Sequence, residues 1–266
     1  MHQVFAMTQD VEHKANDIPT IVACGVLAAT LAAVCHETIG HGTSCRVEGG
    51  QLVLLTSIWF RCQGATSITY VAGPIASLAC GLTGLIFLRR ARKNITRLVL
   101  SLFSAFSLFW FAGQLISQPI TNKDVWSIIA DRLQWPPFWR PIAIILGISS
   151  YVLTLQMLRR TLHSGAPVRG QAILIGYLAG VASAAIAGLM WAAMPMRSAV
   201  EAILTLGVNS IGLILIALSA EEHRNLSHVR ILRSIPLIAV SAAAFLIFVL
   251  VQGRGLGSLA ATALAL

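Results

Sequence analysis

Seven stretches of the sequence contain no Asp, Glu, Lys or Arg, and each is long enough to cross a lipid bilayer as a helix. About 20 mainly apolar residues in a helix cross the ~30 Å hydrocarbon core. Only 11% of the chain is charged, less than half of the ~25% that is typical of soluble domains. The composition excludes a soluble enzyme and a disordered chain. We therefore expect an all-α polytopic membrane protein of about seven transmembrane helices, over residues 18–36, 62–88, 98–122, 141–158, 170–196, 202–220 and 234–253.

The 19 basic residues outnumber the 10 acidic ones, and we interpret this excess as a topology signal, without nucleic acid as a partner. Basic residues mark the cytoplasmic ends of membrane spans. One alternating set of ends carries most of them, which predicts an integral protein of the bacterial inner membrane with its N terminus inside and lipid as its surroundings. That set comprises Lys14, Arg89, Arg90, Arg92, Lys93, Arg97, Arg159, Arg160, Arg169, Arg224, Arg230 and Arg233.

The segment between the first two spans is not an ordinary polar loop, and its apolar run is too short to cross the membrane as a helix. It contains Gly49-Gly50, followed by a run rich in β-branched and aromatic residues from Gln51 to Phe60. We predict a short β-hairpin at the membrane edge. Because lipid cannot satisfy bare backbone, such a hairpin must pack against protein.

Two of the five cysteines, Cys45 and Cys62, flank this hairpin. We expect them on the same side of the membrane and within reach of a disulfide bond. Such bonds form in oxidising compartments.

The chemistry of the chain is concentrated at the end of the first span, in His36-Glu37-Thr38-Ile39-Gly40-His41. A His-Glu-x-x-His helix binds zinc through both histidines, and its glutamate activates water. Here the histidines lie five residues apart, so a regular helix points them about 140° away from each other. A π-bulge would bring them back together; alternatively, the helix ends at Gly40 and His41 folds back.

Other ligand sets and a purely structural role remain open. Glu37, His41 and Cys45 share one face of a continuous helix, which makes Cys45 an alternative metal ligand. Glu201, beside the sixth apolar stretch, is the other acidic residue that adjoins a span. An ionisable group at such a depth indicates a functional site. The competing interpretation is that the two histidines and Glu37 only face the membrane surface.

Polar amides within the spans are expected to bond between helices. They are Gln114, Gln118 and Asn209. Such interhelical hydrogen bonds are common in membrane proteins, and helix packing is the simplest role for them.

The region from His36 to about Leu88 resembles the core of the site-2-type integral membrane metalloproteases and their M50-like relatives. The likeness consists of the His-Glu and Gly-His pairs, the hairpin after Gly49-Gly50, and Ala72-Gly73-Pro74 early in the next span. We expect a single transmembrane domain over 1–266, in which the resemblance marks a metalloprotease-like core at about 18–88 and additional helices follow over 98–253. It also implies His36 and His41 as zinc ligands and Glu37 as general base. No Asp-Gly pair in a later span matches the family's usual third ligand, which leaves Glu201 for that place.

Three functions are compatible with these residues. The first is an intramembrane zinc metalloprotease whose hairpin clamps a membrane-embedded peptide by strand addition. The second is a non-proteolytic membrane enzyme acting on a lipid or quinone, in which copper or iron could replace zinc. The third is a catalytically inactive membrane protein or transporter that keeps the motif.

Overall fold

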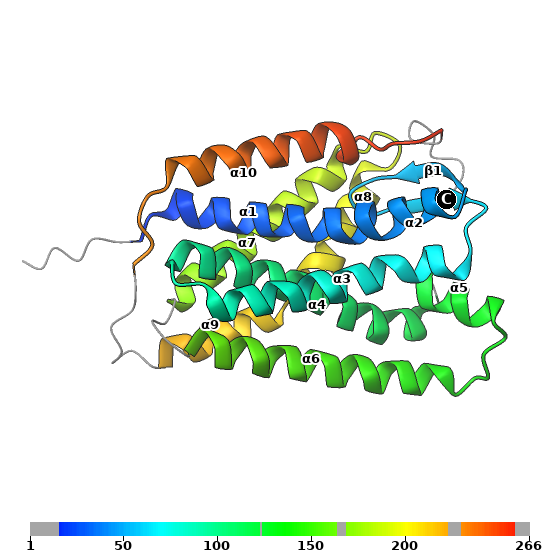
Figure 1. Ribbon diagram of the computed structural model, residues 1–266, viewed down its shortest axis with the longest axis horizontal. Helices are drawn as coiled ribbons and strands as arrows, with labels where there is room; N and C mark the ends of the chain where they lie inside the picture. The colour runs from blue at the N-terminus through cyan, green and yellow to red at the C-terminus, as the bar shows by residue number, and fades with distance from the viewer. Residues whose placement is uncertain (1–15, 123, 164–168, 223–229, 259–266) are drawn as a thin grey trace, which may run out of the picture.

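The apolar stretches form long helices that run alongside one another in a bundle (Figure 1). The computed structural model describes residues 16–122, 124–163, 169–222 and 230–258. Among them, six helices are long and apolar enough to cross a membrane. One bent pair of helices forms a seventh span if the pair is taken as a single span. The expected all-α polytopic fold is confirmed. Two basic residues used for the topology, Lys14 and Arg224, lie outside the described residues.

The spans follow the order of the sequence. The first is continuous from Ile18 to Val47 and consists of α1 (Ile18–Ala33), the π-helix η1 (Val34–Gly42) and α2 (Thr43–Val47). The next four are α3 (Ser67–Arg90), α4 (Asn94–Thr121), α6 (Trp139–His163) and α7 (Gly170–Leu189). The bent pair is α8 (Pro195–Ala202) with η2 (Ile203–Val208), followed by α9 (Gly212–Glu222); the last span is α10 (Ile235–Phe248) with η3 (Val249–Gly253).

Helices α1 and α4 form the centre of the bundle. Helix α1 packs against α4, α7 and α10, and α4 also packs against α3 and α6. In the apolar segment of α4, 72% of the residues are buried inside the protein, whereas the share is 22% in the spans of α6 and α10. Helices α6 and α10 therefore lie at the outside of the bundle and expose most of their surface. One cluster of buried apolar side chains extends from Ile21 to Val249, so the helices after residue 98 share a core with the first span.

Local sequence determines where helices α1 and α3 begin. The Asp17 side chain accepts a hydrogen bond from the Thr20 backbone N–H and caps α1, with Pro19 in the first turn. Thr66 caps α3 in a reciprocal capping box with Thr69. Side-chain oxygens at these positions satisfy backbone N–H groups that the first turn leaves without helical partners.

The sixth apolar stretch, predicted as one span, is bent by 43° at residues 209–211. Two tyrosines from neighbouring helices satisfy backbone groups beside the break. The Tyr177 hydroxyl donates to the Gly207 carbonyl, and the Gly212 N–H donates to the Tyr151 hydroxyl oxygen. Non-helical backbone is tolerated at membrane depth where protein supplies such partners.

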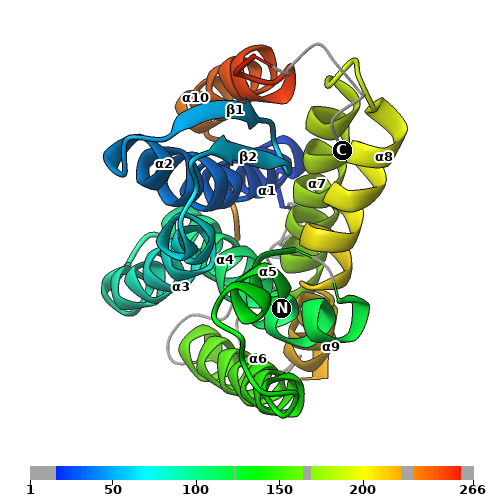
Figure 2. The ribbon, with the colours of Figure 1, turned by 90° about the vertical axis from the view of Figure 1, so that its right-hand side faces the viewer.

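The predicted hairpin is present between the first two spans. Strand β1 (Gln51–Leu55) pairs antiparallel with β2 (Phe60–Gln63), in the register Gln51↔Gln63 and Leu55↔Phe60, with one irregularity near residue 53. Figure 2 shows the two strands side by side over the end of the first span. Leu54 and Leu55 are buried, so the hairpin packs against protein as expected. The short helix α5 (Asp124–Arg132) packs at the ends of α3 and α4.

A disulfide bond joins Cys45 of α2 to Cys62 of β2, with the Cα atoms 6.1 Å apart. This confirms the expected proximity of the two residues. The bond fastens β2 to the helical turn that follows His41.

Breaking this disulfide should lower the free energy of unfolding by about 3 kcal/mol, because it joins residues 17 apart in the sequence and so closes a loop in the unfolded chain. The variant is Cys62→Ser, and the measurement is thermal unfolding in detergent. Cys80→Ala, which removes a half-buried free thiol, is the control and should change stability much less. Equal melting temperatures for wild type and Cys62→Ser would contradict the expectation.

Candidate metal centre

The histidine pair lies in a π-helical turn. Residues Val34–Gly42 form η1, and the helix continues through α2 to Val47. A π-helix bonds residues five apart, so His36 and His41 lie on the same side, with ring centroids 5.0 Å apart and ring planes at 78°. The predicted helix distortion is confirmed, and of the two alternatives the π-bulge is present, not a helix end at Gly40.

Close packing on α3 accompanies this distortion. A Cβ at Gly40 would overlap the backbone of Gly73, and a Cβ at Gly73 would overlap the His41 imidazole. The glycine of the Ala-Gly-Pro sequence therefore makes room for the histidine ring. Glycine pairs allow helices to approach closely, and here that approach brings α3 polar groups to both imidazoles.

His36 is almost fully buried, at 1% exposure. Its Nδ1 lies 2.8 Å from Ser77 Oγ, and its Nε2 lies 3.5 Å from the amide nitrogen of Gln114. Its ring stacks on Trp110, with centroids 4.2 Å apart. An amide nitrogen can only donate, so the consistent arrangement has Nδ1–H donating to Ser77 and a lone pair on Nε2.

His41, at 3% exposure, has the same arrangement. Its Nδ1–H donates to the Thr69 backbone carbonyl over 2.9 Å, and its ring stacks on Phe60 of β2, with centroids 4.7 Å apart. A carbonyl can only accept, so the lone pair again lies on Nε2. Metal-binding histidines usually donate their second ring N–H to a carbonyl or carboxylate in this way.

Glu37 lies between the histidines in sequence and is also buried, at 3% exposure. Its Oε2 has no hydrogen-bond partner among the residues that the structure describes. Leaving such an oxygen without water or a donor costs several kcal/mol unless a proton or a cation compensates it. The carboxylate is therefore poised to accept a proton or to pair with a cation.

A second acidic residue, Asp124 at the start of α5, is close enough to Glu37 for their charges to interact. Gln118 donates to the Asp124 carboxylate over 2.8 Å. Burial raises the pKa of Asp124, and the nearby Glu201 carboxylate raises it further. Asp124 is not among the predicted site residues, because it follows an apolar stretch as an ordinary loop residue would.

The structure distributes the predicted ligands unequally. His36 and His41 are together. Glu37 follows His36 in the same turn, and Glu201 lies in α8 near Asp124. Cys45 is in the disulfide, and since metals bind the thiolate form of cysteine, the alternative set of Glu37, His41 and Cys45 is not assembled. Among the described residues, no three His, Cys, Asp or Glu side chains are grouped to hold a metal ion.

The two imidazoles nevertheless fit a shared zinc ion. Zinc binds imidazole nitrogen at ~2.0–2.1 Å, so two rings at a tetrahedral angle have centroids roughly 5 Å apart. The observed separation is 5.0 Å, and both Nδ1 atoms already have partners, which leaves a lone pair on each Nε2. The lone pair of His36 accepts from the Gln114 amide over 3.5 Å, a bond that a metal ion would replace. The fit extends to these two ligands only.

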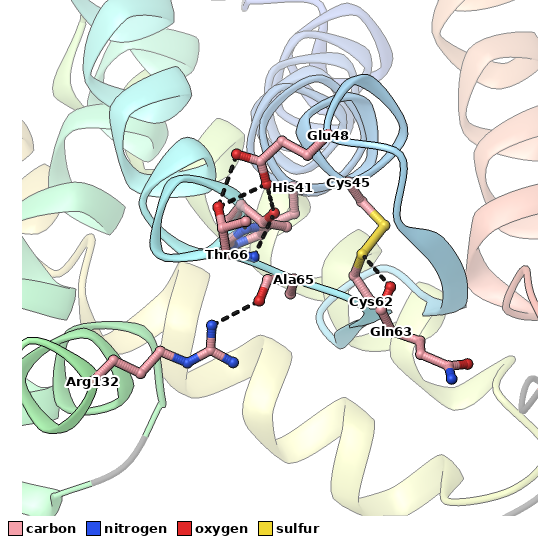
Figure 3. The surroundings of a disulfide bond; sticks show 9 residues. His41, Cys45, Glu48, Cys62, Gln63, Ala65, Thr66 and Arg132 are labelled. Atoms are coloured by element: carbon pink, nitrogen blue, oxygen red, sulfur yellow. Dashed lines mark hydrogen bonds between the residues drawn. A yellow bond between two sulfur atoms is a disulfide. The ribbon is translucent and has the colours of Figure 1, made fainter.

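A carboxylate outside the membrane span supports the position of His41. Glu48 accepts hydrogen bonds from the hydroxyls of Thr66 and Thr69 at the start of α3 (Figure 3). The Thr69 carbonyl is the group that orients His41. Glu48 thus connects the end of the first span to the turn of α3 that positions the imidazole.

Glu48→Gln should destabilise the protein at neutral pH and have little effect in acid. The bond from Thr69, followed by that from Thr66, lowers the pKa of Glu48 below its ordinary value of 4.5. The folded state therefore binds this proton less readily than the unfolded state, so the stabilisation is present above pH 4.5 and is lost as the pH falls through the folded-state pKa. Melting temperatures of both proteins across this range test the expectation, and a pH-independent difference would contradict it.

No family model, curated protein or solved structure matches this chain. The functional interpretation is based on the geometry of the site itself.

Proposed function

We propose that this protein is an intramembrane zinc metalloprotease-like hydrolase that cleaves a membrane-embedded peptide. The observation that supports the proposal most strongly is the π-helical turn, which compensates for the extra residue between His36 and His41 and places the two imidazoles on one side, each with its Nδ1 bonded and a lone pair on Nε2. In this proposal His36 and His41 hold the ion, and Glu37 is the general base.

Bound zinc supplies Lewis acidity and makes water easier to deprotonate. Glu37, with its unpartnered Oε2, accepts the proton from the attacking water and passes it to the leaving amine. The Gln114 amide nitrogen, adjacent to His36, is a donor for the oxygen on which negative charge develops.

The hairpin favours an extended peptide over a lipid or quinone as the substrate. Leu256 already occupies the outer side of β1, through two backbone hydrogen bonds to Leu55. Strand β2 carries Phe60, which stacks on His41. A peptide that adds to the other edge of β2 would therefore lie beside the candidate metal centre, with its backbone in the pairing geometry of strand addition.

Metal removal tests the function. The purified protein in detergent is given a quenched fluorescent peptide with an apolar membrane-spanning sequence, with and without prior treatment with a zinc chelator. We expect cleavage by the zinc-loaded protein, loss of cleavage after chelation, and recovery when zinc is added back. Undiminished cleavage by the metal-free protein would contradict the metal-dependent mechanism, and no cleavage by the zinc-loaded protein would contradict the protease assignment.

We also propose that the protein resides in the bacterial inner membrane with the metal centre toward the outer face. Helix α3 has 24 residues, about 36 Å in length, and it separates the hairpin end from the basic turn at 89–97. The disulfide at the hairpin end suits an oxidising compartment.

A topology reporter fused at Lys93 tests this orientation. We expect cytoplasmic activity, because Arg89, Arg90, Arg92 and Lys93 cluster at this turn. A reporter that is active outside the cytoplasm would reverse the orientation of the whole bundle.

A further inference from the structure

The π-helical turn is held on one side by α3 and on another by the end of the last span. The α3 contacts involve the histidines, through Ser77 and Thr69. On the other side the Thr38 hydroxyl, one residue after Glu37, donates to Gln252 Oε1 over 2.7 Å. Gln252 lies in η3, more than 200 residues away in sequence.

The Gln252 carboxamide has a second partner. Its Nε2 donates to the Thr56 carbonyl at the end of β1 over 2.9 Å, and the side chain is buried, at 5% exposure. One amide group therefore joins the π-helical turn, the hairpin and the last span. Buried amides with both ends satisfied specify a single arrangement of the elements they connect.

The backbone after Gln252 keeps this amide in place. Leu256 exchanges two hydrogen bonds with Leu55, of 2.9 and 2.8 Å. Gly257 follows with φ of +104°, and a Cβ there would overlap the Val53 carbonyl. The chain past η3 thus pairs with β1 through a single antiparallel bridge between Leu256 and Leu55, and the next position is one where only glycine fits without displacement.

We propose that Gln252 is a positioning residue for the candidate metal centre. By accepting the Thr38 hydrogen bond, it holds η1 in its π-helical register and so keeps His36 and His41 on one side. π-Helical turns are rare in proteins, and without this bond the turn is free to adopt α-helical spacing, in which the two imidazoles point about 140° apart. The metal-binding consequence rests on the proposed function; the effect on helical register does not.

Thr38 offers a matched pair of variants for the test. Thr38→Val keeps the shape of the side chain and removes the hydroxyl, whereas Thr38→Ser keeps the hydroxyl. Co²⁺ is titrated into each purified protein, and binding is followed by the visible spectrum of the bound ion. We expect Thr38→Val and Gln252→Met to weaken Co²⁺ binding about 10–100-fold, the range for loss of an orienting partner, and Thr38→Ser to bind as the wild type does.

The double variant shows whether the two residues act through their shared bond. If they do, Thr38→Val combined with Gln252→Met binds Co²⁺ no more weakly than Gln252→Met alone. If the wild type binds Co²⁺ and both single variants bind it equally well, Gln252 is not a positioning residue and the proposed function stands.

Hydrogen exchange, which needs no bound metal, tests the role of Gln252 if the wild type does not bind Co²⁺. If the wild type binds no Co²⁺, the proposed function fails, and hydrogen exchange of the backbone amides of residues 38–42 then decides the role of Gln252. We expect faster exchange in Thr38→Val and Gln252→Met than in wild type and Thr38→Ser. Equal exchange in all four proteins would overturn the inference.

Discussion

Replacing His41 with alanine is expected to weaken zinc binding by at least 100-fold. Loss of a partner that merely orients a ligand costs 10–100-fold, and His41 is in this account one of only two protein ligands. The substitution also removes the ring that stacks on Phe60 and the N–H that pairs with the Thr69 carbonyl. The measurement is competition with a chelating dye on purified protein.

His163→Ala is the control. It removes a histidine at the C-terminal end of α6 and should bind zinc as tightly as the wild type. His36→Ala should match His41→Ala. Zinc affinity that is unchanged in His41→Ala would show that this histidine is not a ligand.

Replacing Glu37 with glutamine should preserve zinc binding and lower the cleavage rate about 10²–10⁴-fold, the usual contribution of a general base. Glutamine keeps the size of the side chain, and its amide cannot accept the proton from water. Cleavage of the fluorescent membrane peptide and zinc content are measured on the same preparation.

Asp131→Asn, at an exposed position of α5, is the matched carboxylate-to-amide control and should leave both quantities unchanged. A Glu37→Gln variant that cleaves at the wild-type rate would eliminate Glu37 as the base. A variant that loses its zinc would indicate that Glu37 is a ligand as well.

If His36 and His41 are to share one metal ion, their spacing requires a distortion of the first span, because five residues turn a regular helix by ~500° and point the two rings about 140° apart. Sequence could not choose between a π-bulge and a helix end at Gly40. That choice depends on α3, where Gly73 leaves room for His41 and where Ser77 and Thr69 bind the two rings. The hairpin and the Cys45–Cys62 pair were predictable because both follow from a short local segment.

The parts of the site that were missed come from distant elements. The expected interhelical bond of Gln114 is confirmed, but its partner, His36, was not predicted. Asp124 and Gln252 are brought to η1 from α5 and η3, and no local pattern marks either residue. The bend at 209–211 was also missed, since the apolar composition is uniform through it; Gly207, Asn209 and Gly212 are the residues there that could have signalled it.

X-ray absorption at the zinc edge tests most directly whether His36 and His41 share one metal ion. We expect stoichiometric zinc with two imidazole ligands at ~2.0–2.1 Å, oxygen in the remaining positions and no sulfur. Zinc with a single imidazole, or with sulfur at ~2.3 Å, would contradict the site as described.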